Sequence, residues 1–137
     1  MNTRIRQKIT EIEQSVELIE SHIPSSLDEF ENSGLLKDGI YKRLEFVIQN
    51  ILDIITQFHK EGNSDVPGSY DDIIYHLHKK KIFSPSIIVL LKEMKGLRNI
   101  LVHRYGTIND EIIYTVITTK LDDIYKVLTA ITKHLET

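Results

Sequence analysis

Apolar residues recur at alternating steps of three and four along most of this chain, and no other feature constrains its fold as strongly. The longest series lies near the C-terminus and comprises Ile113, Ile117, Leu121, Ile124, Leu128, Ile131 and Leu135. Residues three and four apart share one face of an α-helix, so each series predicts a helix with one apolar side. Isoleucine alone favours strands, but series of this length outweigh that small intrinsic preference.

A polar connector separates the first two predicted helices. The first helix is expected to end at Pro24, and its apolar series is Ile5, Ile9, Ile12, Val16, Ile19 and Ile23. In the connector PSSLDEFENSG, Leu27 and Phe30 are expected to pack against the helices. The second helix is expected over about 39–60, with the series Leu44, Val47, Ile48, Ile51, Ile55 and Phe58.

Capping residues position the remaining helices. Ser69 is expected to cap a short helix in SYDDIIYHLHKKK, and Ser84 with Pro85 is expected to begin the third main helix. Gly106 is expected to end that helix in a left-handed conformation, and Asn109 to cap one long final helix. The pattern therefore predicts an all-α, up-and-down four-helix bundle with an additional short helix.

Length and composition limit the class of protein. A chain of 137 residues that is 41% hydrophobic fits a single domain, residues 1–137, with a substantial core. The absence of cysteine excludes disulfides and thiolate metal sites and favours the cytoplasm. No apolar run approaches the roughly 18 residues that span a bilayer, so no membrane association is expected. The net charge of −3 argues against broad polyanion binding, so any nucleic-acid role depends on a local site.

The stretch GLRNILVHRYGTIND places Arg98 where the third main helix calls for an apolar residue. At about 100° per residue, Arg98 lies on the face of Leu91, Met94 and Leu101, whereas His103 lies about 140° away. A guanidinium keeps its proton, so burying it costs on the order of several kcal/mol unless an anion meets it. We therefore expect an anion beside Arg98.

Two anions fit this expectation. If a carboxylate on a neighbouring helix pairs with Arg98, the pair is structural, Tyr105 packs at the bundle end and His103 is a solvated surface residue. If the anion is a phosphodiester, Arg98 binds it, His103 transfers protons near neutral pH and Tyr105 supplies a hydroxyl. Residue chemistry alone favours the structural pair.

Arg98, His103 and Tyr105 form an R-x4-H-x-Y pattern, and MKGLRNILVHRYG around it resembles the HepT-like toxins of the HEPN superfamily. The similarity extends to LKDGIYKRLEFVIQNILDI, VPGSYDDIIYHLHKKKIFSP and INDEIIYTVITTKLDDI, and so covers nearly the whole chain. The resemblance implies a homodimeric bundle that cleaves RNA as a metal-independent endoribonuclease without a cofactor. It also implies a type VII-like toxin–antitoxin pair, in which an MntA-like nucleotidyltransferase antitoxin transfers AMP to Tyr105.

The resemblance assigns catalytic roles to Arg98 and His103. Cleavage without metal uses the 2′-hydroxyl of RNA as nucleophile, so His103 suits the proton transfers and Arg98 the developing charge. Asn99 is expected to support them by orienting the phosphate or capping the helix end. Asp53 lies opposite the apolar side of its helix and is expected to orient Arg98 or His103 if that face joins the dimer interface.

A dimer also accounts for the separation of Arg98 from His103, because two chains meeting at a two-fold axis contribute both residues to one cleft. Distortion of the helix before Gly106 is the alternative. Gly96 either allows close approach of the second chain or is a tolerated surface glycine.

His76 and His78 are two residues apart, a spacing that places them on different faces of a helix, so no metal site is expected. The alternative function is a non-catalytic subunit that binds a nucleotidyltransferase and is modified by it.

Overall fold

The computed structural model describes residues 2–62, 68–103 and 106–137, with only the backbone described at 106–108. These residues contain helices and no strand. The helices are α1 (Thr3–Glu20), α2 (Leu27–Glu31), α3 (Leu35–Gly62), α4 (Tyr70–Lys79), α5 (Pro85–Val102), α6 (Gly106–Thr119) and α7 (Leu121–Leu135).

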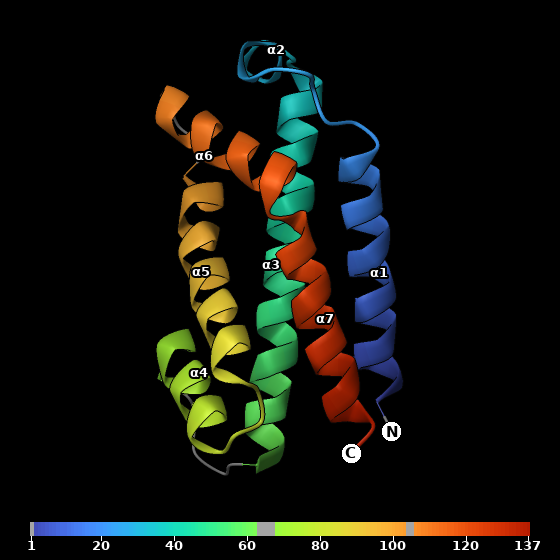
Figure 1. Cartoon of the computed structure of the whole chain (residues 1–137), viewed down its shortest axis with the longest axis vertical. Helices are drawn as coiled ribbons and strands as arrows, with labels where there is room; N and C mark the ends of the chain where they lie inside the picture. Colours follow the sequence, from blue (N-terminus) through green and yellow to red (C-terminus); the bar gives the residue numbers. More distant parts are fainter. Residues whose placement is uncertain (1, 63–67, 104–105) are drawn as a thin grey trace.

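Four long helices, α1, α3, α5 and α7, lie side by side and alternate in direction, with α4 beside the lower half of α5 (Figure 1). This arrangement confirms the predicted all-α, up-and-down bundle. The predicted apolar series face one core, and their fully buried members include Ile12, Val16, Leu44, Ile48, Ile51, Ile55, Ile113 and Ile131. None of the helices in the described ranges is long and apolar enough to cross a bilayer.

The prediction of one long C-terminal helix is wrong. The chain bends at Lys120 (φ −124°, ψ 8°), so that α6 crosses the end of the bundle and packs on α2, while α7 runs down the bundle (Figure 1). A one-residue break leaves the spacing of apolar residues unchanged, so the pattern could not reveal it. Asn109 lies inside α6 and does not cap it, because α6 already begins at Gly106.

Capping side chains and a left-handed glycine determine where several other helices begin. Ser69 and Ser84 are N-caps as predicted, their Oγ atoms accepting from the amides of Asp72 (3.2 Å) and Ile87 (3.4 Å). The connector forms the short helix α2, which buries Phe30 completely. Helix α3 begins four residues earlier than predicted, directly after a left-handed Gly34 (φ 59°).

Candidate active site

Helix α5 ends within the R-x4-H-x-Y pattern. Its last residue is Val102, and His103 is the C-cap, with its amide donating to the Asn99 carbonyl over 3.2 Å. The predicted stop at Gly106 is therefore wrong, because α5 ends four residues earlier and Gly106 is already in α6. Tyr105 lies outside the described residues.

The end of α5 is tied to α6 by one side chain. Asn109 Nδ2 donates to the carbonyl oxygen of His103 over 3.0 Å, which satisfies an acceptor that the helix end leaves open. The side chain of His103 is exposed. The turn therefore presents the imidazole to solvent from a backbone held by α6.

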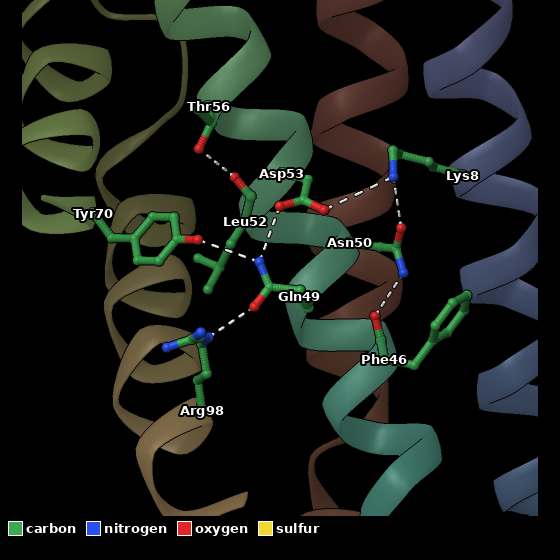
Figure 2. A network of polar contacts seen from close by, with 9 residues as sticks. All are labelled: Lys8, Phe46, Gln49, Asn50, Leu52, Asp53, Thr56, Tyr70 and Arg98. Carbon is green, nitrogen blue, oxygen red and sulfur yellow. Dashed lines mark hydrogen bonds and ion pairs between the residues drawn. The ribbon is translucent and has the colours of Figure 1, made fainter. Parts of the chain in front are cut away.

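Arg98 projects from the C-terminal part of α5 towards α3 (Figure 2). Its Nε donates to Oε1 of Gln49 over 2.8 Å, and its guanidinium carbon lies 5.9 Å from the centre of the Tyr70 ring. Among the described residues, neither a carboxylate nor any other group pairs with its two terminal nitrogens. The first of the two alternatives, a structural pair between Arg98 and a carboxylate, is therefore not found in this part of the chain, where the neutral amide of Gln49 accepts from Nε instead.

Gln49 connects Arg98 to two further groups. Its Nε2 donates to Oδ1 of Asp53 over 2.9 Å and to the hydroxyl of Tyr70 over 3.2 Å (Figure 2). Asp53 also faces Lys8 of α1, whose Nζ lies 3.9 Å from Oδ2. Asp53 thus reaches Arg98 through Gln49 within one chain.

The same network continues towards α1. Lys8 Nζ donates to Oδ1 of Asn50 over 2.9 Å, and Asn50 Nδ2 donates to the Phe46 carbonyl over 2.8 Å (Figure 2). Side chains of α1, α3, α4 and α5 therefore meet in one polar patch, and Phe46 beside it is 37% exposed. The two terminal nitrogens of Arg98 have no partner among the described residues.

Comparison with known families identifies the chain. The sequence profile of the family described as "Ribonuclease HepT-like" matches residues 12–131. The chain belongs to the HepT-like ribonuclease family. The resemblance inferred from the R-x4-H-x-Y pattern is thereby confirmed.

Individual relatives cover almost the whole of this HepT-like chain. The mRNA nuclease HepT of Shewanella oneidensis is 27% identical over 123 residues, which is 90% of this chain and 92% of the relative. The tri-AMPylated Shewanella oneidensis HEPN toxin in complex with MNT antitoxin has a TM-score of 0.83 at 26% identity, covering 97% of this chain and 99% of that one. The cytosolic protein YutE of Bacillus subtilis, at 21% identity, shares the fold with a TM-score of 0.79 and coverages of 98% and 90%.

The structure of this HepT-like chain brings some predicted site residues together and not others. Asp53 and Arg98 are joined through Gln49 within one chain, and the orienting role of Asp53 stays a prediction. Asn99 and His103 are exposed, and in the described part of the chain no hydrogen bond or ion pair links either side chain to Arg98.

Gln49 and Tyr70 were not predicted from the sequence. Gln49 lies one turn before Asp53 on the polar side of α3, and Tyr70 opens α4, but neither belongs to a motif. The described residues hold no cluster of three or more His, Cys, Asp or Glu side chains suited to a metal ion. What this part of the site offers is a fixed guanidinium with free donors, the chemistry that binds a phosphate.

Proposed function

We propose that this chain is the toxin of a toxin–antitoxin pair and cleaves RNA as a metal-independent endoribonuclease. Membership of the HepT-like ribonuclease family and the 27% identity to an mRNA nuclease over 90% of the chain support this function. The observation that carries it is Arg98, whose Nε is held while its terminal nitrogens are unpaired among the described residues. RNA and nucleotides are available in the cytoplasm, where we place the activity.

The proposed reaction uses the 2′-hydroxyl of the substrate. A base removes its proton, the 2′-oxygen forms a bond to phosphorus, and the bond from phosphorus to the 5′-oxygen breaks as that oxygen takes up a proton. His103, exposed at the end of α5, serves the proton transfers. Arg98 stabilises the extra negative charge on the phosphoryl oxygens, and Asn99 orients the phosphate from the last turn of α5.

We further propose that two chains form one composite active site. No hydrogen bond or ion pair links Arg98 to His103 among the residues that the structure describes, and a homodimer lets Arg98 of one chain and His103 of the other act on one phosphodiester. Gly96 is exposed and a Cβ there would meet nothing within 4 Å in the single chain, which leaves room for a second backbone. Gly96, Asn99 and His103 are then near the two-fold axis.

The proposed antitoxin is an MntA-like nucleotidyltransferase that transfers AMP to Tyr105. The similar Shewanella oneidensis toxin is tri-AMPylated and in complex with an MNT antitoxin, which supports the same partnership here. Tyr105 is seven residues after Arg98 in the sequence. An AMP group attached to it adds the negative charge of a phosphodiester and the bulk of a nucleotide, which block RNA by repulsion and volume. Modification therefore silences the nuclease.

Incubation of purified protein with cellular RNA tests the proposed activity. Wild type should cleave RNA but not DNA, with and without EDTA, and Arg98→Ala and His103→Ala should lose cleavage. Arg4→Ala and His78→Ala are the matched controls, because both residues are exposed and lie outside the pattern. Equal cleavage by wild type and both site variants would reveal a contaminant, and absence of cleavage would favour a non-catalytic subunit modified by the nucleotidyltransferase.

A further inference from the structure

Gln49 is the group that fixes the orientation of Arg98. Its Oε1 accepts from Arg98 Nε over 2.8 Å, while its Nε2 donates to Asp53 Oδ1 over 2.9 Å and to the Tyr70 hydroxyl over 3.2 Å (Figure 2). Turning the amide over would place an NH2 donor against a guanidinium donor and an oxygen against a carboxylate. The amide therefore has one favourable orientation, and it points its acceptor at Arg98.

The position of the contact determines which donors of Arg98 stay available. Among the described residues only Nε donates a hydrogen bond, and the Tyr70 ring lies 5.9 Å from the guanidinium carbon. A guanidinium binds an anion best through two parallel N–H donors, and here the two terminal nitrogens have no partner among the described residues. Within the described part of the chain, the guanidinium is thus held at Nε, and its two terminal nitrogens are available.

The group that accepts the hydrogen bond from Arg98, the amide of Gln49, is also neutral. Within the polar patch the charged side chains are Lys8, Asp53 and Arg98, so that two positive charges face one negative charge. A carboxylate at position 49 would pair with Arg98, remove the excess positive charge and repel Asp53 across the present 2.9 Å contact. An amide holds the guanidinium and leaves its charge for a ligand.

We propose that Gln49 is a positioning residue of the nuclease, which holds Nε of Arg98 with a neutral acceptor so that both terminal nitrogens bind one phosphate of single-stranded RNA. This inference rests on the proposed function. It assigns Asp53 and Tyr70 a supporting role, because their contacts fix the amide of Gln49. Gln49 itself does not touch the reacting atoms.

Two substitutions at position 49 distinguish the hydrogen bond that holds Arg98 from the positive charge that Arg98 keeps for a ligand. Gln49→Leu removes the acceptor at similar size and leaves the positive charge of Arg98, whereas Gln49→Glu keeps an acceptor and cancels that charge. Gln57→Glu is the matched control, since it adds the same charge at an exposed position two turns along α3. Circular dichroism of each variant verifies that the helices are intact.

The measurement is the affinity of full-length protein for a 2′-O-methyl RNA oligonucleotide, which cannot be cleaved, by fluorescence anisotropy at several salt concentrations. Gln49→Glu should weaken binding about tenfold and lower the slope of log Kd against log salt by about 0.7, the share of one single-strand phosphate contact. Gln49→Leu should weaken binding with an unchanged slope, and Gln57→Glu should bind as wild type. Wild-type affinity and slope in both Gln49 variants, or equal changes in Gln57→Glu, would overturn the inference.

Cleavage of unmodified RNA by the same variants distinguishes the two proposals. If Gln49 variants alter binding as expected but wild type cleaves no RNA, the positioning role stands and the nuclease function fails. If wild type cleaves and Arg98→Ala does not, while both Gln49 variants bind and cleave as wild type, the nuclease function stands and the positioning role fails.

Discussion

Asp110 fastens the start of α6 to α3, next to the turn that carries His103. Its Oδ1 accepts from the Tyr41 hydroxyl over 2.6 Å, and its Oδ2 accepts from Lys37 Nζ over 3.1 Å. The Asp110 side chain is only 11% exposed, against 28% for Lys37. Asp110→Asn keeps the shape of the side chain and places an NH2 group against the ammonium of Lys37.

The loss of stability expected for Asp110→Asn follows from these contacts. A hydrogen bond to a charged group contributes about 1.5–3 kcal/mol, and the partial exposure of Lys37 favours the lower end. Asn Oδ1 still accepts from Tyr41, so only the Lys37 bond is lost. We expect a free energy of unfolding lower by about 1.5 kcal/mol, which for a domain of this size lowers Tm by about 5 °C.

Thermal unfolding followed by circular dichroism measures this shift. Glu111→Gln is the control, because it removes one negative charge from the adjacent exposed position of α6. Its Tm should stay within about 1 °C of wild type, as is usual for exposed substitutions. An unchanged Tm in Asp110→Asn, or an equal fall in both variants, would refute the assignment of Asp110 as the α6 anchor.

Three further predictions concern modification, pH and assembly. Tyr105→Phe should cleave RNA yet gain no AMP from the nucleotidyltransferase and ATP in intact-mass spectrometry, and modification equal to wild type would move the acceptor elsewhere. Burial, with a hydrogen bond to Glu20, raises the pKa of Tyr125 to about 12. An unfolded tyrosine has a pKa of about 10, so this contribution to stability is complete below pH 10 and is lost as the pH rises towards 12. The urea concentration at the midpoint of unfolding should therefore fall less steeply between pH 10 and 12 in Tyr125→Phe than in wild type. An equally steep fall in both proteins would contradict this assignment. Gly96→Leu should leave the fold intact but weaken the dimer in sedimentation, and an unchanged dimer would place the interface elsewhere.

The fold was largely predictable because burial imposes a period on the sequence. The series from Ile113 to Leu135 identified the buried face of two helices correctly, although it could not show that Lys120 separates them. That bend depends on α6 packing against α2, a contact between distant segments that no local spacing encodes. Phe30 was expected to be buried, but the helix that carries it was not foreseen.

The site was predictable only in part, for a similar reason. Arg98 stands out because a permanent cation on an apolar face needs a partner, and that argument uses one helix alone. Gln49 and Tyr70 are ordinary residues on other helices, and which of them lies opposite Arg98 is decided by bundle packing. The sequence therefore indicated the cation and not the neutral group that holds it.

Subunit complementation tests the central claim, RNA cleavage by Arg98 of one chain with His103 of another, most directly. Arg98→Ala and His103→Ala chains are produced together with different affinity tags, and the mixed dimer is purified through both. One of its two composite sites then has both residues intact, so it should cleave RNA at about half the wild-type rate, while each parent dimer is inactive. An inactive mixed dimer beside an active wild type would contradict the composite site.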